Sequence, residues 1–211
     1  MVEIIDSSHM LNGFDRFFML VLIATVIVGY YQVYFLPQKH RLLKARSFET
    51  KLDSLIKYNP RWVWMYSGLY YPAILIIGFC VPSWVQLVYV IMSAGALLLL
   101  HCTIFFLMPV QVPIHWRKPN NPGLSQKALN FVQGIDDRCN SFPSMHVGVA
   151  MLIDLYIHKF VPEVYPLGML VPIIIAISAL KTKQHFVVDI LPGVITGYSV
   201  FKLWEYLFIF V

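Results

Sequence analysis

The sequence is short of charge: only 13% of its 211 residues are Asp, Glu, Lys or Arg, whereas 58% are hydrophobic. Soluble domains carry roughly a quarter charged residues, so this shortage argues against a soluble globular protein. The apolar runs also lack the alternation of apolar and polar residues that a membrane β-barrel needs. The composition therefore predicts an all-α membrane protein, in which each helix satisfies its own backbone polar groups.

The sequence also lacks the cysteine patterns of disulfide frameworks and structural zinc sites. Its three cysteines, Cys80, Cys102 and Cys139, form an odd number without a CxxC spacing. The first apolar run has no small-residue cleavage pattern before Pro37, so we interpret it as a retained span and not as a signal peptide. We expect no metal, no other cofactor and no nucleic-acid partner; the expected partner is the lipid bilayer.

Six apolar segments come close to the roughly 20 residues that a helix needs to cross a hydrocarbon core about 30 Å thick. They lie near residues 17–36, 62–81, 85–108, 144–159, 164–181 and 186–209. Asp154 interrupts the fourth segment and Pro172 the fifth, whereas Gly193 and Gly197 give the sixth a small-xxx-small pattern suited to close helix packing. We therefore predict a single membrane-embedded domain over residues 1–211, a bundle of six transmembrane helices.

One membrane face would receive the two long loops and a short turn, at residues 37–61, 109–143 and 181–185. In the first loop, four apolar residues recur at the spacing of one helix face, with Lys and Arg between them: Leu42, Phe48, Leu52 and Leu55. This pattern predicts a basic amphipathic helix lying in the headgroup plane near anionic lipid, with an ordinary solvated connector helix as the alternative.

Two polar segments stand at the ends of the predicted spans on this face. Polar and ionisable side chains cost on the order of 3 kcal/mol each at the centre of a transmembrane helix, so their clustering here indicates function. The first is NSFPSMHVG, residues 140–148, in which Pro143, Ser144 and His146 fall in the first turn of a predicted helix. Because the free backbone N–H groups of such a turn attract anions, we expect Ser144 to contact a phosphate.

The second polar segment is KTKQHFVVD, residues 181–189, which leads into the sixth span. His185 and Asp189 are four residues apart and share one helix face, so the carboxylate can accept a hydrogen bond from one ring nitrogen and leave the other free. A nucleophilic histidine needs this fixed tautomer and a stabilised imidazolium. Lys181 and Lys183 add positive charge to the same turn.

Together these segments resemble the second and third signature motifs of the type 2 phosphatidic acid phosphatase superfamily. FPSMHVG is similar to the family's PSxH element and KTKQHFVVDILPG to its HxxxD element, in a spelling nearest to the inositol phosphorylceramide synthase and sphingomyelin synthase branch. The resemblance implies a metal-independent double displacement on a membrane lipid phosphate. In that reaction His185 would attack phosphorus, His146 would protonate the leaving oxygen and Asp189 would orient His185.

The sequence departs from the family pattern at two places. The third motif usually has an arginine six residues before the histidine, where this chain has Ala179, and the first motif has no clean match. The stretch 108–119 lies where the first motif should be. The basic residues that could bind phosphate instead are Lys181, Lys183, Arg117, Lys118 and Arg138. A lysine supplies charge without the two-point fork of a guanidinium, so the phosphate could be held less rigidly.

These features leave three alternative functions for the protein. The first is a lipid phosphate phosphatase, in which water accepts the phosphoryl group. The second is a lipid headgroup phosphotransferase, in which an alcohol accepts it. The third is a catalytically silent lipid binder or transporter, which the missing arginine and the poor first motif would suit.

The charge distribution and the family resemblance predict opposite sides of the membrane for the site. The loop face carries thirteen Lys and Arg residues and the opposite face three. The positive-inside rule therefore predicts a cytosolic site, whereas the family resemblance implies an extracytosolic one.

Overall fold

Helices dominate the computed structural model, which describes residues 11–117, 123–164, 167 and 169–208. The longer helices are α1 (Gly13–Tyr34), α4 (Tyr70–Cys80), α5 (Trp84–Leu107), α6 (Leu124–Ile135), α7 (Met145–Phe160), α8 (Leu170–Lys181) and α9 (Val187–Leu207). The shorter ones are α2 (Leu36–Lys39), α3 (Lys51–Leu55), the 3-10 turns Pro60–Trp62, Ile114–Trp116 and Pro162–Val164, and the π-helix Trp64–Leu69. The described residues form no β-strand, so the all-α class is confirmed for them.

Four helical stretches are long and apolar enough to cross a membrane: Gly13–Lys39, Pro60–Cys80, Trp84–Leu107 and Val187–Leu207. They match the first, second, third and sixth predicted spans. The other two are shorter, because α7 has 16 residues and α8 has 12, the latter beginning only at Leu170. The described part of the chain thus has the character of an integral membrane protein, with four helices of spanning length and not six.

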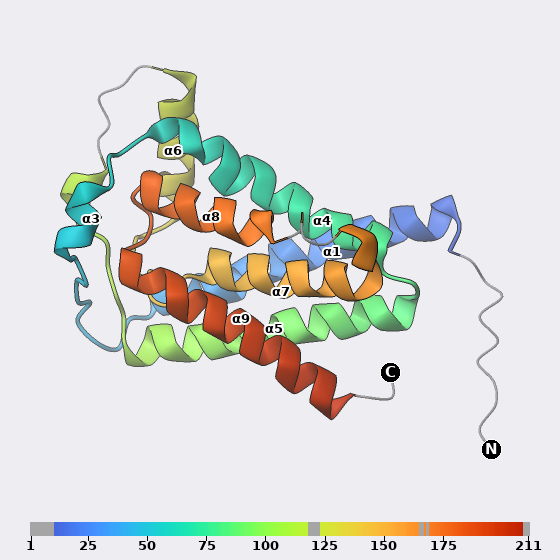
Figure 1. The fold of residues 1–211 in the computed structure, drawn as a ribbon. Coiled ribbons are helices and arrows are strands. Elements are labelled where there is room, and N and C mark those ends of the chain that lie inside the picture. The colour runs from blue at the N-terminus through green and yellow to red at the C-terminus, as the bar shows by residue number, and fades with distance from the viewer. Residues whose placement is uncertain (1–10, 118–122, 165–166, 168, 209–211) are drawn as a thin grey trace.

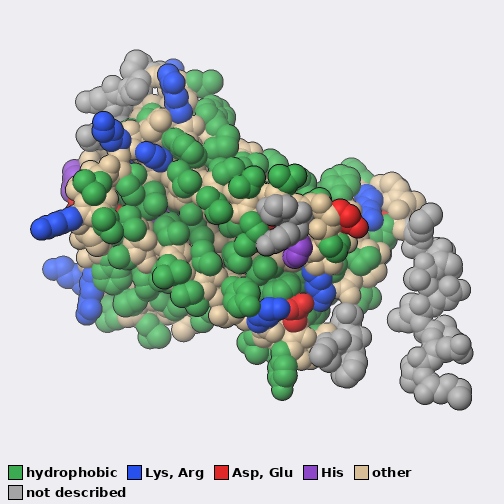
Figure 2. Space-filling view, in the orientation of Figure 1, with side chains coloured by type: hydrophobic (Ala, Val, Ile, Leu, Met, Phe, Trp, Pro, Cys, Tyr) green, Lys and Arg blue, Asp and Glu red, His purple; other side chains and the backbone are tan. Residues whose placement is uncertain are grey.

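Successive long helices run in opposite directions, so the connections from α1 to α4, from α5 to α7 and from α8 to α9 gather at one end of the bundle (Figure 1). This end, which we call the loop end, also carries α3 and α6. α7 lies in the centre and contacts α4, α5, α8 and α9, whereas α1 packs against α4 and α5. In Figure 2, hydrophobic side chains cover the flank of the bundle and Lys and Arg cluster at the loop end.

The central helix α7 meets α9 at glycines, as the small-xxx-small pattern predicts. A Cβ atom on Gly193 would lie 2.6 Å from the carbonyl oxygen of Ser144, and one on Gly197 would overlap the carbonyl oxygen of Gly148. Only a residue without a side chain lets the two backbones approach so closely. This contact brings the start of α9 beside the start of α7.

The predicted amphipathic helix in the first loop is wrong for most of its length. Only Lys51–Leu55 is helical there, and residues 40–50 are extended or irregular. The reason is a pairing between loops, since Arg46 N–H donates to the carbonyl of Pro109 (2.9 Å) and the carbonyl of Arg46 accepts from Gln111 N–H (2.8 Å). A backbone engaged in this way with another segment cannot close the hydrogen bonds of a helix.

An amphipathic helix does occur at the loop end, but in the second loop. α6 turns an apolar stripe of Leu124, Phe131 and Ile135 outward, and it buries Gln126 and Gln133. Its inner side is held by hydrogen bonds, one of them from the Tyr58 hydroxyl to Gln126 Oε1 at 2.6 Å. No helix was predicted over these residues.

Candidate active site

The polar segments singled out in the sequence meet at the loop end, where three stretches of extended backbone lie side by side. Val110 is paired with Arg46 on one side and with Asn140 on the other. The Ser141 N–H continues this pairing by donating to the Val110 carbonyl (3.2 Å). Two long loops thereby fix the position of Ser141 just before α7.

His185, in the turn before α9, is buried and held through one ring nitrogen. Its Nδ1 lies 2.8 Å from the carbonyl oxygen of Ser141 and 3.3 Å from Oδ2 of Asp189. Since a carbonyl oxygen can only accept, Nδ1 is the nitrogen that carries the proton. Nε2 then presents its lone pair, and no described residue hydrogen-bonds to it.

Asp189, in the first turn of α9, is fully buried and binds more than the histidine. Its Oδ2 accepts hydrogen bonds from the Ser141 hydroxyl (2.5 Å) and from the backbone N–H of Phe186 (2.8 Å). The carboxylate thus caps α9 and ties the loop before α7 to it. The sequence places His185 and Asp189 together as the structure does, but the nearer partner of the imidazole is the Ser141 carbonyl.

His146, in the first turn of α7, lies against aromatic rings. Its Nδ1 is 3.0 Å from the Tyr66 hydroxyl, and its ring stacks on that of Tyr66 with centroids 4.3 Å apart. The Tyr70 ring contacts it from a second direction at 4.8 Å. The centroids of His146 and His185 are 6.1 Å apart, so both imidazoles can contact one tetrahedral phosphoryl group.

Arg117 is the predicted phosphate partner with unused donors. One terminal nitrogen, Nη1, donates to the backbone carbonyls of Gln133 (2.6 Å) and Asp136 (2.8 Å). Nε and Nη2 are buried and have no hydrogen-bond partner among the described residues. Burial lowers the pKa of this guanidinium, and the nearby Asp136 and Tyr66 oppose that shift.

Lys183 is engaged elsewhere. Its Nζ donates to the backbone carbonyl of Asp53 (2.5 Å) and lies 4.7 Å from the centroid of the Trp116 ring. Burial lowers the pKa of this ammonium, while Asp53 and Glu49 oppose the shift. These contacts join the turn before α9 to α3, so Lys183 supports the scaffold of the site.

The remaining predicted phosphate partners differ in their surroundings. Ser144 is buried as the N-cap of α7, where its Oγ accepts from Val147 N–H (3.4 Å). Arg138 donates from Nη1 to the Val112 carbonyl (3.3 Å). The Lys181 side chain is half-buried and has no polar partner among the described residues, and Lys118 lies outside those residues.

The arrangement supplies the groups that phosphoryl transfer needs: a nucleophile with a fixed tautomer, a second imidazole for proton transfer and a guanidinium for charge. Within the described ranges, no three His, Cys, Asp or Glu side chains are grouped as the ligands of a metal ion.

Sequence reasoning did not assign roles to Ser141, Tyr66, Tyr70 or Asp53. Tyr66 and Tyr70 are four residues apart, a spacing that would place both rings on one helix face. Asp53 is the buried acid of a basic loop, and its Oδ1 accepts from Val187 N–H at the start of α9 (2.8 Å). Ser141 contacts His185 through its backbone carbonyl, for which the sequence has no signal, and Asp189 through its hydroxyl.

Comparison with known proteins gives one match. The family model described as PAP2 superfamily matches residues 59–203, which include α4 to α8, most of α9 and every site residue named above except Asp53. No curated protein and no solved structure matches the chain. Helix α1 lies outside the matched region.

Proposed function

The chain belongs to the PAP2 superfamily, and from this membership we propose that it hydrolyses a membrane lipid phosphate through a phosphohistidine on His185. The superfamily and the apolar helices support an integral membrane enzyme of the phosphatase or phosphotransferase kind. The observation that carries the proposal is the hydrogen-bond partner of His185 Nδ1. Its Nδ1 faces the acceptor-only carbonyl of Ser141 at 2.8 Å, so Nε2 is the lone-pair nitrogen.

In the first step Nε2 of His185 attacks phosphorus, an N–P bond forms and the bond from phosphorus to the lipid oxygen breaks. The His146 imidazolium gives its Nε2 proton to the leaving oxygen, and its Nδ1–H donates to the Tyr66 hydroxyl oxygen. The phosphorylated ring of His185 gains a positive charge, which the Asp189 carboxylate and the Ser141 carbonyl stabilise.

In the second step a water oxygen attacks phosphorus while neutral His146 takes a proton from that water through Nε2. The N–P bond breaks, inorganic phosphate leaves and His185 returns to its starting tautomer. Arg117 has two donor nitrogens to which no described residue is bonded, and these suit two oxygens of the transferred group. Ser144, Lys181 and Arg138 are further candidates for the phosphate set, and Lys183 has its ammonium committed to Asp53.

The proposal includes six spans in a single membrane-embedded domain. α7 and α8 would complete the four longer helices, because both continue the alternation of helix directions in Figure 1. The short α8 and the ionisable residues of α7 would be sheltered by their neighbours, and α7 contacts four other helices.

A lipid headgroup phosphotransferase is the second candidate, since it shares the first step and differs only in the acceptor. The sequence favours it through the synthase-like spelling of FPSMHVG. An alcohol on a second lipid would then take the phosphoryl group in place of water. A silent lipid binder would form no phosphohistidine at all.

The test uses purified protein in proteoliposomes containing EDTA and a panel of labelled lipid phosphates. Free phosphate, new lipid products and acid-labile phosphoprotein are measured together. We expect phosphate release by the wild type and its loss, by more than about a thousandfold, in His185→Ala and His146→Ala. His40→Ala, at an exposed histidine, is the matched control and should keep full activity.

Full activity in His185→Ala would refute the phosphohistidine. A labelled lipid product in place of free phosphate would establish the transferase instead. Neither product, together with no phosphoprotein in the wild type, would indicate the silent binder.

A further inference from the structure

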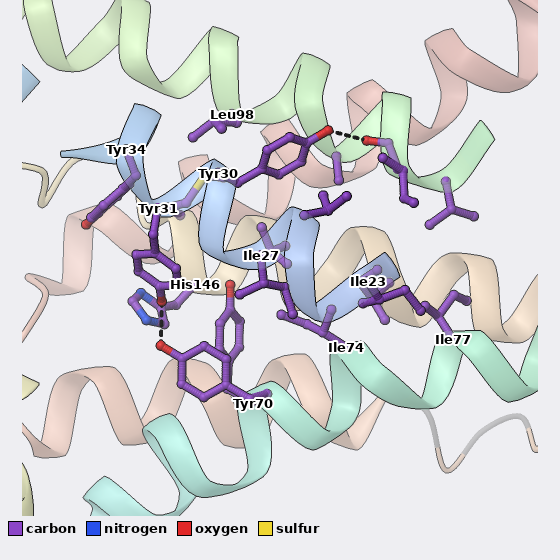
Figure 3. Close-up of a pocket in the computed structure, with 18 of the residues that line it drawn as sticks. Ile23, Ile27, Tyr30, Tyr31, Tyr34, Tyr70, Ile74, Ile77, Leu98 and His146 are labelled. Carbon is purple, nitrogen blue, oxygen red and sulfur yellow. Dashed lines mark hydrogen bonds between the residues drawn. The ribbon is translucent and has the colours of Figure 1, made fainter. Parts of the chain in front are cut away.

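An apolar cavity begins at His146 and extends between α1, α4, α5 and α7 (Figure 3). Its volume is about 100 Å³, so it is narrow and suits a slender occupant. Apart from His146 and five tyrosines, the lining residues that the structure describes are Ile, Val, Leu, Ala and Met. The cavity therefore joins the proposed acid of the reaction to a hydrocarbon-like interior.

Three of the five tyrosines of the wall add little polarity to this interior, because the protein satisfies their hydroxyl groups. The Tyr30 hydroxyl donates to the Ile91 carbonyl (2.8 Å), and the hydroxyls of Tyr31 and Tyr71 bond to each other (2.5 Å). An occupant would meet ring faces and aliphatic side chains there. Apolar cavities of this kind bind apolar groups and exclude water.

The largest share of the wall comes from a helix outside the superfamily match. Six of the nineteen lining residues belong to α1, and the matched region begins only at residue 59. Ile23, Ile27 and Tyr30 project from this helix toward the cavity, as Figure 3 shows. The outline of the cavity is thus a property of this chain and not of the matched region alone.

We propose that this cavity holds the hydrocarbon chain of the lipid phosphate and that α1 decides which chains fit. The inference rests on the proposed function, because the phosphate end of the same molecule must lie between His146 and His185. Continuity of the cavity with His146 identifies the occupant as the substrate's own chain. The chain passes from one apolar medium into another, so selectivity depends on fit and not on hydrophobic driving force.

Ile27 is the position that tests fit most directly, since it lines the cavity and is half-buried. Ile27→Trp would fill the cavity and Ile27→Ala would enlarge it, so their effects on chain preference should have opposite signs. Val28, the next residue, points away from the bundle and is 63% exposed. Val28→Trp is therefore the matched control for adding an indole to α1.

The experiment measures kcat/KM for phosphate release from straight-chain alkyl phosphates, from short to long, in mixed micelles. For Ile27→Trp we expect a fall of about tenfold or more on long chains and less than about twofold on the shortest. Ile27→Ala should move the optimum toward longer chains. Val28→Trp should follow the wild type, and melting temperature with gel-filtration profile verifies the fold of each variant.

Two outcomes would overturn the inference: an unchanged chain profile in both Ile27 variants, or equal losses on short and long chains. Failure of the proposed function has a different signature, because the wild type would then release no phosphate even from the shortest chain. In that event the affinity of non-hydrolysable alkyl phosphonates of different chain length, measured by competition against a labelled one, tests the cavity. The inference would also be overturned if the affinity did not change with chain length, or did not change with the substitutions at Ile27.

Discussion

The ring centroids of His185 and His146 are 6.1 Å apart, yet their surroundings differ. His185 is held by a hydrogen-bond network of Ser141 and Asp189, which we call the polar lattice, and His146 is held by aromatic rings. Around His185, the Ser141 carbonyl and the Asp189 carboxylate both face Nδ1. Around His146, the fixed contacts are the stacked ring and hydroxyl of Tyr66 and the ring of Tyr70. The first environment fixes where the proton is, whereas the second fixes the plane of the ring.

The difference suits two different tasks. A nucleophile must present the same lone pair in every cycle and gains positive charge on attack, so acceptors and a negative charge on its other nitrogen stabilise it. A group that gives and takes a proton must change charge twice in each cycle. In the proposed mechanism Nδ1 keeps its proton in both charge states and donates to the Tyr66 hydroxyl oxygen, so Nε2 is free to give and take the proton. Losses at the polar lattice should therefore be large, and losses at the aromatic side should be graded.

Asp189→Asn breaks the polar lattice with the smallest change of shape. An amide nitrogen cannot accept the hydrogen bonds that Oδ2 receives from Ser141 and Phe186, so the NH₂ group must take the place of the buried Oδ1, which has no partner in the described part of the chain. We expect kcat to fall by about 10²–10³-fold. The Ser141 carbonyl still holds the tautomer, which keeps the loss below that of His185→Ala. We expect the free energy of unfolding to fall by about 1–3 kcal/mol.

Initial rates and thermal melting in the same detergent measure both effects of Asp189→Asn. Asp137→Asn is the control, because that carboxylate is exposed and its one ion pair among the described residues is with Arg41 at the surface. Wild-type turnover in Asp189→Asn would show that the negative charge has no part in catalysis, and the two histidines would then differ less than we argue.

Sequence alone predicts the features that depend on local spacing. The four-residue separation of His185 and Asp189 correctly predicts that the two side chains meet, although His185 lies in the turn before α9 and not on a helix face shared with Asp189. The alternation of spans puts His146 at the same end of the bundle. The glycine pattern of α9 correctly predicts close packing. Each of these inferences uses only residues within one segment and the order of the segments.

Features that depend on pairing between loops were not predictable. The first loop has a helical pattern of apolar residues, but Arg46 pairs with the backbone around Val110, which in turn positions Ser141. Tyr66 reaches His146 from a position 80 residues earlier in the chain. Such contacts follow from the packed structure, where tertiary pairing overrides local propensity. For the same reason the lysine closest to the motif histidine, Lys183, turned out to bind Asp53.

Tyr66→Phe sharpens the comparison from the aromatic side. The ring stack on His146, with centroids 4.3 Å apart, would remain, and only the hydroxyl at 3.0 Å from Nδ1 would be lost. Because one hydrogen bond contributes about 0.5–1.5 kcal/mol, we expect kcat to fall by up to about tenfold. The shape of the pH profile of kcat should also change, since the lost partner touches the group that exchanges protons. A purely structural role of the hydroxyl would lower kcat equally at every pH.

Tyr70→Phe is the matched control for Tyr66→Phe, because the Tyr70 ring also contacts His146 but its hydroxyl does not bond to it. It should leave both kcat and the pH profile close to those of the wild type. Equal behaviour of the two variants would remove Tyr66 as a positioning residue. The aromatic side would then act by shape alone.

Lys183→Met has the smallest expected effect on the reaction and tests whether charge beside the polar lattice serves catalysis or scaffold. Because Nζ is bound to the Asp53 carbonyl and lies over Trp116, we expect kcat/KM to change by less than about threefold. Burial lowers the pKa of Lys183 below 10.5 in the folded protein, so the unfolded chain binds more protons between the two values. Stability of the wild type should therefore rise as pH increases through that window, and the Met variant should lack this contribution. Melting curves of both proteins across that range measure it, with Lys57→Met at an exposed lysine as control. A large loss of kcat/KM that Lys183→Arg restores would instead put this cation on the phosphate, and the lattice around His185 would be catalytic throughout.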